Sequence, residues 1–263
     1  MPSRRPGHAR AGRLRRGRSA EPGNDTGSTY SFEVHSQPFT GVVALDGPAG
    51  TGKSTVAQRL AARLGIHYLD TGAMYRAATV AVLRAGVDPA DADAVAGVVA
   101  ASRIEVSLDP AEQRTTLDGA DVSVQIRSPQ TTAAVSAVSA VGRVRELLVQ
   151  QQRELIRRGP TVAEGRDIGS VVWPDAELKV YLTAREEVRA LRRAGQLGER
   201  DVAGIAESMR RRDDFDSSRA VSPLHRPDGA TEVDTSDLSI DEVVGVLAEL
   251  ARQAMPVATA DRR

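Results

Sequence analysis

The stretch that decides the fold class of this chain is VVALDGPAGTGKST, residues 42–55. Its apolar run at 42–45 predicts a buried strand of a parallel sheet. GPAGTGKS at 47–54 matches the spacing G-x-x-x-x-G-K-S/T of a phosphate-binding loop, and helical sequence follows from Lys53 to Leu64. The motif needs this context, because backbone N–H groups and a helix N-terminus together hold phosphate oxygens. An accidental glycine-rich turn is therefore a weak alternative.

Strands and helices alternate outward from this loop. A helix is expected at 73–85, and further strands are expected at 66–70, 161–164, 178–182 and 231–235. Such alternation predicts an α/β fold in which helices cover both faces of a parallel sheet. Near the C-terminus, Ser239 and Glu242 form a capping-box pattern ahead of an amphipathic helix.

Two regions break the alternation. In residues 104–124 apolar and polar side chains alternate around Asp118 and Gly119, which supply a hairpin-like turn, so we expect a small antiparallel insertion. Residues 185–219 are rich in arginine and poor in large apolar side chains. This second region predicts exposed, mobile helices.

Composition limits the possible classes of protein. The chain has 263 residues, 41% of them hydrophobic and 27% charged, which is typical of a globular protein. It contains no cysteine, which excludes disulfides, thiolate catalysis and cysteine-dependent metal sites. The sequence also has no apolar run of membrane-spanning length and no secretory signal pattern. We therefore expect a cytoplasmic protein without a membrane partner.

Charge is unevenly distributed along the chain. Residues 1–20 hold seven arginines and no acid, which leaves 35 − 7 = 28 basic against 35 acidic residues in the remainder. This acidic body argues against a nucleic-acid-binding main domain. We expect a disordered, arginine-rich tail at 1–40, a folded domain at 41–253 and a disordered end at 254–263. The tail is the one place where nonspecific nucleic-acid binding is expected; its composition also fits a transit peptide, although we favour a start-site or species-specific extension.

The phosphate-binding loop alone fits a GTPase, an ATP-driven motor or a small-molecule kinase. A GTPase needs an N-K-x-D motif, but the sequence has a single asparagine, Asn24. A motor usually needs a longer chain. A kinase needs a second anion site and movable arginines over the transferred phosphoryl group.

Candidates for that second site follow two of the expected strands. DTGAMYR at 70–76 places Thr71 at a helix N-terminus with Tyr75 and Arg76 one turn along. EGRDIG at 164–169 places Arg166 and Asp167 at a carboxyl strand end, where open α/β sheets bind ligands. Two arginines there suit a phosphate monoester. Asp167 fits Mg²⁺ binding and pairing with an arginine equally well.

The loop itself is expected to bind ATP and Mg²⁺. Lys53 would bridge the β- and γ-phosphates, and the hydroxyl of Ser54 would coordinate the metal. The expected ATP-binding residues are Gly47, Pro48, Ala49, Gly50, Thr51, Gly52, Lys53, Ser54 and Thr55.

Five motifs in order make the chain similar to bacterial cytidylate kinases, the P-loop nucleoside monophosphate kinases that phosphorylate CMP and dCMP with ATP. They are VVALDGPAGTGKST, YLDTGAMYR, SAVGRVRELLVQQQRE with the insertion before it, VAEGRDIGSVVWPDAELKVYL and RRDDFDSSRAVSPL, and the resemblance runs from Val42 to Arg252. It implies a five-stranded parallel sheet flanked by helices. It also implies an acceptor-binding insertion at about 102–135 and a short helical lid at about 187–216.

The resemblance also implies roles for individual residues. Arg192 and Arg193 would be lid arginines, acting in catalysis with Lys53 and Arg166. The acceptor would contact Thr71, Tyr75, Arg76 and Arg166 through its phosphate, Ser136 and Arg145 through cytosine, and Arg212, Asp216 and Arg219 through ribose and base, with Asp167 nearby. Thr71 stands where the family often has Ser, and Glu164 where a shorter Asp is frequent.

Base chemistry agrees with two of these roles. Arg145 can only donate hydrogen bonds and suits N3 or O2 of cytosine, whereas the Ser136 hydroxyl can accept from N4. Without the resemblance, Asp216 among Arg212 and Arg219 would be interpreted as a salt-bridged helix face. The alternatives are a kinase for another small acceptor such as UMP, and a nucleotide-gated RNA-binding protein. We expect a monomer.

Overall fold

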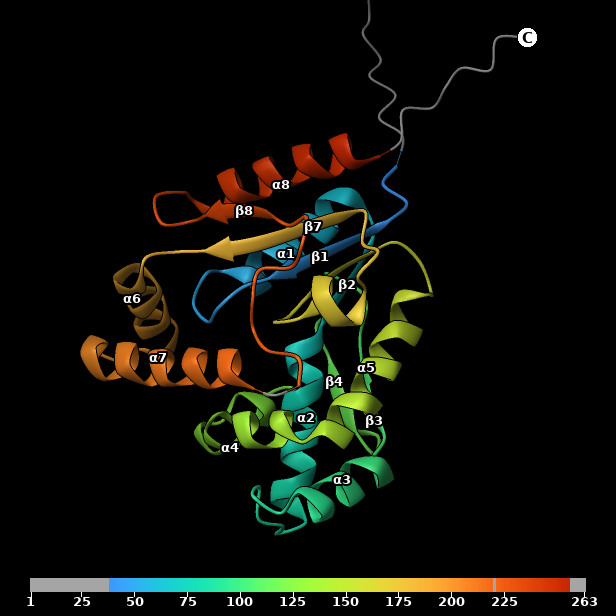
Figure 1. The fold of residues 1–263 in the computed structure, drawn as a ribbon, viewed down its shortest axis with the longest axis vertical. Coiled ribbons are helices and arrows are strands. Elements are labelled where there is room, and N and C mark those ends of the chain that lie inside the picture. Colours follow the sequence, from blue (N-terminus) through green and yellow to red (C-terminus); the bar gives the residue numbers. More distant parts are fainter. Residues whose placement is uncertain (1–37, 220, 256–263) are drawn as a thin grey trace, which may run out of the picture. The chain divides into compact units, whose positions relative to one another are not determined.

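A five-stranded parallel sheet forms the centre of the molecule (Figure 1). The computed structural model describes residues 38–219 and 221–255. The sheet has the order β2-β6-β1-β7-β8, with parallel pairing throughout. Its strands are β1 (Val42–Asp46), β2 (His67–Asp70), β6 (Thr161–Glu164), β7 (Leu178–Thr183) and β8 (Thr231–Asp234). The five-stranded parallel sheet is thereby confirmed.

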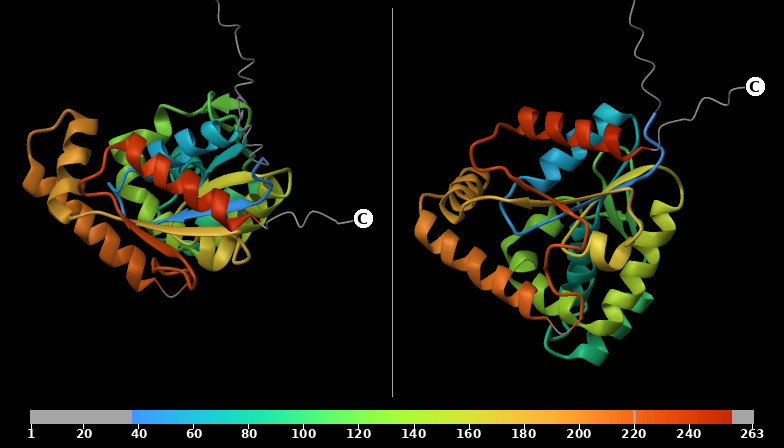
Figure 2. Two further views of the ribbon diagram at one scale, coloured as in Figure 1. Left: turned by 90° about the horizontal axis from the view of Figure 1, so that it is seen from above. Right: turned by 45° about the horizontal axis from the view of Figure 1, so that its top comes forward.

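Successive side chains of β1 point into two separate cores, as the two-residue repeat of a strand requires. Val42 and Ala44 belong to the core that contains α2 (Thr71–Arg84) and α5 (Gly142–Ile156). Val43 and Leu45 belong to the core that contains α1 (Lys53–Leu64) and α8 (Ile240–Ala254). Figures 1 and 2 show α8 on one side of the sheet and α2 on the other. Helices therefore cover both faces, as the alternation predicted.

Local sequence signals fix where the helices begin. Asp70 caps α2 by accepting a hydrogen bond from the Ala73 N–H at 2.9 Å. The capping box of Ser239 and Glu242 at the start of α8 is confirmed, since each side chain bonds the other's backbone N–H.

The antiparallel insertion is also confirmed. A three-stranded sheet is formed by β3 (Ile104–Val106), β4 (Thr115–Leu117) and β5 (Ala120–Asp121). Asp118 and Gly119 have φ angles of 52° and 81°, and positive φ at both positions is what the tight turn between β4 and β5 requires. Along the chain, α3 (Ala92–Ala101) precedes this sheet, and η1 (Gln125–Arg127) and α4 (Pro129–Ala140) follow it.

Two packed helices, α6 (Glu186–Leu197) and α7 (Val202–Ser218), form the arginine-rich region. Figure 2 shows them together at one end of the molecule, and in Figure 1 the arrowheads of β7 and β8 point to that side. The predicted lid therefore lies at the carboxyl edge of the sheet. Its helical character agrees with the sequence, whereas its mobility stays a prediction.

The domain boundaries stay predictions. Residues 1–37 and 256–263, which make up most of the expected tail and C-terminal end, lie outside the described residues. Phe39 is only 5% exposed and packs in the core beneath α1 and α8, so the packed body includes residues before Gly41. Within 38–219 and 221–255, no helix is both long and apolar enough to cross a membrane.

Candidate active site

The phosphate-binding loop leaves the carboxyl end of β1 and runs directly into α1. A Cβ atom at Gly47 would lie 2.2 Å from the Leu182 carbonyl oxygen, so no larger residue fits between the loop and β7. Gly52 has φ 93° and caps α1. The first turn of α1 thus begins at the motif lysine, with Ser54 and Thr55 exposed beside it.

Lys53 lies in a buried, charged setting. Its Nζ donates to the Pro48 carbonyl at 2.6 Å. Burial lowers the pKa of Lys53, and the charge of Arg166 lowers it further. Burial raises the pKa of the neighbouring Glu164, whose carboxyl accepts a 2.6 Å hydrogen bond from the Tyr68 hydroxyl. Negative charge from a bound polyphosphate would offset both penalties on the lysine.

Asp46, the last residue of β1, joins the loop to the turn that follows β6. Its two carboxyl oxygens accept hydrogen bonds from the N–H groups of Ile168 and Gly169, both at 2.8 Å. These two residues open the π-helical turn η2 (Ile168–Val172). Burial raises the pKa of Asp46 to about 6, although the backbone hydrogen bonds oppose the rise.

The structure brings arginines from four separate segments into one cluster. Burial and the charge of Arg212 lower the pKa of Arg76 to about 10, and burial and the charge of Arg166 lower that of Arg212 to about 10. The pKa values of Arg193 and Arg219 are also lowered, first by burial. Arginines that repel one another in a partly dry site bind anions strongly.

Two arginines of the cluster are held in place by hydrogen bonds to other segments of the chain. The Nη1 of Arg166 donates to the Gly47 carbonyl at 2.8 Å, and its Nε donates to Asp216 at 3.0 Å. Arg76 donates to the Ile126 carbonyl and to the Thr132 hydroxyl, both at 3.0 Å. These bonds hold the guanidinium group of Arg166, which follows β6, against the loop, and that of Arg76, on α2, against η1 and α4.

Arg145 and Asp167 form a buried ion pair. The carboxylate accepts from Arg145 Nη2 at 2.5 Å, and both side chains are almost fully buried. Arg145 also donates to the Ser139 carbonyl at 3.2 Å and lies 5.1 Å above the Tyr75 ring. The sequence left Mg²⁺ binding and pairing with an arginine open for Asp167. The contact with Arg145 is that of a carboxylate paired with an arginine.

The structure places three other predicted acceptor residues as follows. The buried Thr71 donates its hydroxyl proton to the Glu164 carbonyl at 2.7 Å. Asp216 of α7 is 4% exposed and lies 3.9 Å from Arg219 in addition to its bond with Arg166. Ser136 is half-buried on α4, and its carbonyl accepts from the Ser139 hydroxyl at 3.1 Å. The roles of Thr71 and Ser136 toward a substrate stay predictions.

The helices α6 and α7, the predicted lid, contact the loop through residues that the sequence did not indicate. Arg189 of α6 donates to the Ala49 carbonyl at 3.1 Å and pairs with Asp213 of α7. Asp213 in turn accepts from the Ala49 N–H at 3.2 Å. Arg189 and Asp213 are therefore part of the site, and the position of Arg189 one turn before the predicted lid arginines was the available signal.

The two predicted lid arginines differ in position. Arg192 donates to the hydroxyl and the carbonyl of Thr235 at 2.9 and 2.6 Å, and Thr235 donates to the Thr51 carbonyl at 3.1 Å. Thr235 therefore links Arg192 to the phosphate-binding loop at Thr51. Arg193 contacts Gln196 at 3.2 Å and adds its charge to the arginine cluster.

The site fits a magnesium ion that arrives with a nucleotide. Mg²⁺ bound with ATP keeps several waters and takes one or two protein oxygens besides phosphate. The hydroxyl of Ser54 offers such an oxygen. It lies next to Glu164, where its hydrogen bond opposes the rise that burial causes in the pKa of that carboxyl. Within the described part of the chain, no group of three or more His, Cys, Asp or Glu side chains could hold a metal without the nucleotide.

The matches to known proteins span nearly all of the residues that the structure describes. The sequence profile described as cytidylate kinase matches residues 43–253. The cytidylate kinase of Rhodococcus opacus (strain B4) is 55% identical over 211 residues, which cover 78% of this chain and 92% of that protein. That of Mycobacterium avium (strain 104) is 53% identical over 225 residues, covering 82% and 97%. These matches show that the chain belongs to the cytidylate kinase family.

Proposed function

We propose that this protein is a cytidylate kinase, which transfers the γ-phosphoryl group of ATP to CMP or dCMP. A phosphate oxygen of the acceptor attacks the γ-phosphorus while the bond to the β–γ bridging oxygen breaks. The products are ADP and CDP or dCDP. The acceptor oxygen is already ionised near neutral pH, so the reaction needs alignment and charge stabilisation rather than a strong general base.

The observation that carries this proposal is the arginine cluster facing the phosphate-binding loop. Lys53 and Arg166 lie on the loop side, and Arg76, Arg212 and Arg219 extend the positive charge beyond it. The lowered pKa values of Lys53, Arg76, Arg212 and Arg219 mean that the positive charge of the cluster is not balanced until anions enter. Two facing phosphate groups, one from the donor and one from the acceptor, would satisfy it.

Selection of cytosine is supported by the Arg145–Asp167 pair. A donor and an acceptor lie side by side there, and the hydrogen-bonding edge of cytosine offers acceptors at N3 and O2 and a donor at N4. Uracil presents a donor at N3 and an acceptor at O4, which mismatches this order. Asp216 is the candidate for contact with the ribose.

Magnesium would be held by the hydroxyl of Ser54 together with the phosphates of ATP. When bound, the ion neutralises charge that develops on the transferred group. The chain's own contribution is to hold the triphosphate on the loop amides and Lys53 and to cover it with α6 and α7. Covering the site excludes water and so suppresses ATP hydrolysis. Action as a cytoplasmic monomer stays a prediction of the sequence.

A coupled assay of ADP production tests the proposal. The purified protein with ATP and Mg²⁺ is given CMP, dCMP, UMP, AMP or shikimate, and CMP and dCMP should be the preferred acceptors. Lys53→Ala should fold normally and lose at least about 100-fold in turnover, because it removes one cation from the point of greatest charge development. Preference for UMP, or ATP hydrolysis that depends on RNA instead of an acceptor, would favour one of the two alternatives.

A further inference from the structure

Gln152 is a polar residue in an apolar position. It lies on α5 two turns after Arg145, and its side chain is 0% exposed. Leu148, Leu155 and Ile156 of the same helix belong to the core beneath α2. A leucine or methionine at position 152 would continue the apolar face that these residues form.

Packing alone does not explain the amide. Neither Oε1 nor Nε2 of Gln152 has a hydrogen-bond partner within 38–219 and 221–255 that meets normal geometry. A buried amide group in this condition costs about 1–3 kcal/mol of folding stability. An apolar residue of similar length would avoid that cost, so the glutamine carries a role other than stability.

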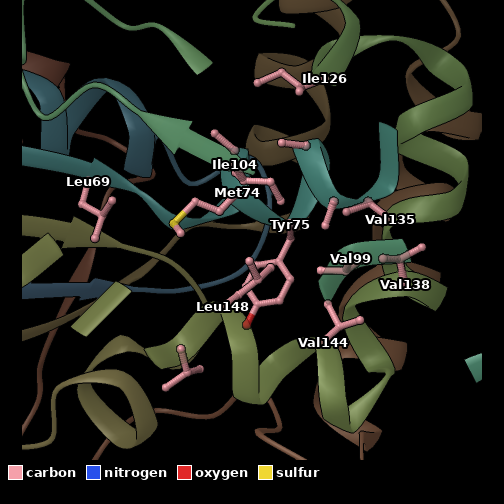
Figure 3. Close-up of a cluster of buried hydrophobic side chains, with 14 of the residues drawn as sticks. Leu69, Met74, Tyr75, Val99, Ile104, Ile126, Val135, Val138, Val144 and Leu148 are labelled. Carbon is pink, nitrogen blue, oxygen red and sulfur yellow. The ribbon is translucent and has the colours of Figure 1, made fainter. Parts of the chain in front are cut away.

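The group beside the amide is the hydroxyl of Tyr75. Burial raises the pKa of Tyr75 to about 12, while hydrogen bonding from the Gln152 side chain opposes the rise. The two groups are thus buried polar neighbours, and their separation or angle falls outside a normal hydrogen bond. Figure 3 shows the Tyr75 ring among apolar side chains of the same core, including Val144 and Leu148.

The ring of Tyr75 is in turn one of three supports of Arg145. The guanidinium lies 5.1 Å above the ring centre, donates to Asp167 and donates to the Ser139 carbonyl. Asp167 and Ser139 each fix one end of the planar group, and the ring face fixes its tilt. A rotation of the ring would therefore turn the donors that face the acceptor base.

We propose that Gln152 is a positioning residue for base selection: its amide is the polar neighbour of the Tyr75 hydroxyl and thereby sets the ring on which Arg145 lies. This inference rests on the proposed function, in which Arg145 and Asp167 select cytosine. Gln152 touches neither substrate in this arrangement. It acts through Tyr75, on the geometry of a group whose misplacement by about 1 Å can cost roughly 100-fold in rate.

The test replaces the amide by an apolar group of the same length, Gln152→Met. We expect kcat/KM for CMP to fall by about tenfold, from the loss of one hydrogen-bonding group in the selection site. The ratio of kcat/KM for CMP to that for UMP should fall by a similar factor. The KM for ATP should stay within twofold, and the thermal midpoint should equal or exceed that of the wild type.

Two further variants keep the test decisive. Gln150→Met makes the same change on the exposed face of α5, where Gln150 contacts Glu154, and should alter neither selectivity nor stability. Tyr75→Phe removes the other member of the pair and should reproduce the loss of CMP selectivity. Because both changes act on the same pair of neighbouring side chains, the double variant should lose less than the two single losses combined. Tyr75→Phe also remains informative if Gln152→Met does not fold.

Several outcomes would overturn the inference. A CMP-to-UMP ratio within twofold of the wild type in Gln152→Met would show that the amide does not act on base selection. Parallel losses of activity toward both acceptors and of thermal midpoint would assign Gln152 to the core alone. Failure of the proposed function is separate, because the wild-type protein would then show no preference for CMP in the acceptor panel.

Discussion

Arg145 has two partners whose loss would have different effects. Its guanidinium neutralises the buried carboxylate of Asp167 and is also the proposed reader of cytosine. Arg145→Met would leave Asp167 buried without a counter-ion, which typically costs 3–5 kcal/mol of stability. A loss of activity in that variant would therefore not isolate base reading.

Arg145→Lys separates the two roles. Lysine keeps a positive charge near Asp167 but lacks the planar fork that binds Asp167 and faces the base together. We expect the KM for CMP to rise by about tenfold or more, discrimination against UMP to fall, and the KM for ATP to stay nearly constant. Steady-state kinetics with CMP and UMP at saturating ATP measure this, and unchanged CMP-to-UMP selectivity would remove Arg145 from base reading.

Asp46 gives a prediction about pH. Burial raises its pKa from 3.8 to about 6, so between these values the folded protein binds a proton that the unfolded chain releases. Stability must then fall as pH rises through this interval, and the penalty persists above pH 6. The rise of the Asp46 pKa to about 6 corresponds to a penalty of about 3 kcal/mol at higher pH.

Asp46→Asn removes this titration and should flatten that part of the stability curve. Urea unfolding of both proteins at several values from pH 4 to pH 7 gives the comparison. The variant also loses one acceptor for the Ile168 and Gly169 N–H groups, but this cost is the same at every pH. Identical slopes in the two proteins would mean that the pKa of Asp46 is not raised.

At the residue scale, the sequence identified those site residues whose chemistry depends on neighbouring positions in the chain. The loop from Gly47 to Ser54 is defined by its own spacing, and the structure places it as expected. Asp213 could not be identified this way, because its role comes from contacts with Ala49 and Arg189 in other elements. A run of charges on a helix does not reveal which member faces the site.

At the scale of elements, α6 and α7 meet the phosphate-binding loop at Gly50. This glycine has φ 77°, and a Cβ there would lie 2.6 Å from the Met209 methyl carbon and 2.9 Å from the Arg189 carbonyl oxygen. The methionine side chain can move, but the backbone carbonyl of α6 cannot yield by itself. An alanine at position 50 would therefore push the lid away from the loop.

Gly50→Ala should accordingly raise the KM for ATP by about tenfold and raise the share of ATP hydrolysed without an acceptor, since an open lid admits water. Gly65→Ala is the matched control, because Gly65 has φ 67° and open space around its Cβ position. Both variants carry the backbone penalty of about 1–2 kcal/mol. Only the first should change kinetics, and wild-type kinetics in Gly50→Ala would contradict lid closure on the loop.

The existence of elements was predictable, whereas their arrangement was not. The sequence indicated all five strands of the main sheet, most plainly β1, whose fully buried residues make a continuous apolar run, and least plainly β8, where Val233 alone is buried. Nothing in the chain order states that β6 lies between β1 and β2, from which some 90 residues or more separate it. That order arises from packing, and it places Glu164 and Arg166 beside the loop.

At the scale of the whole molecule, Phe39 marks how far toward the N-terminus the packed body extends. It is 5% exposed in the core with Val43, Leu178 and Leu247. Removing a buried phenylalanine side chain typically costs 3–5 kcal/mol. In a body of this size each kcal/mol lowers the thermal midpoint by about 2–4 °C. A deletion that includes Phe39 should thus lower the midpoint by roughly 10 °C.

Deleting residues 1–37 should instead leave kinetics and the thermal midpoint close to those of the full chain. This segment contains few large apolar side chains and carries seven arginines in its first twenty positions, so its composition offers little to bury. Its removal makes the protein more acidic, and nonspecific, salt-sensitive retention on RNA should fall sharply. Acceptor kinetics, thermal melting and RNA retention are compared for the full chain, the deletion of 1–37 and the deletion of 1–40. A large loss of activity or stability in the shorter deletion would show that the segment docks on the body, because Phe39 is still present in that protein.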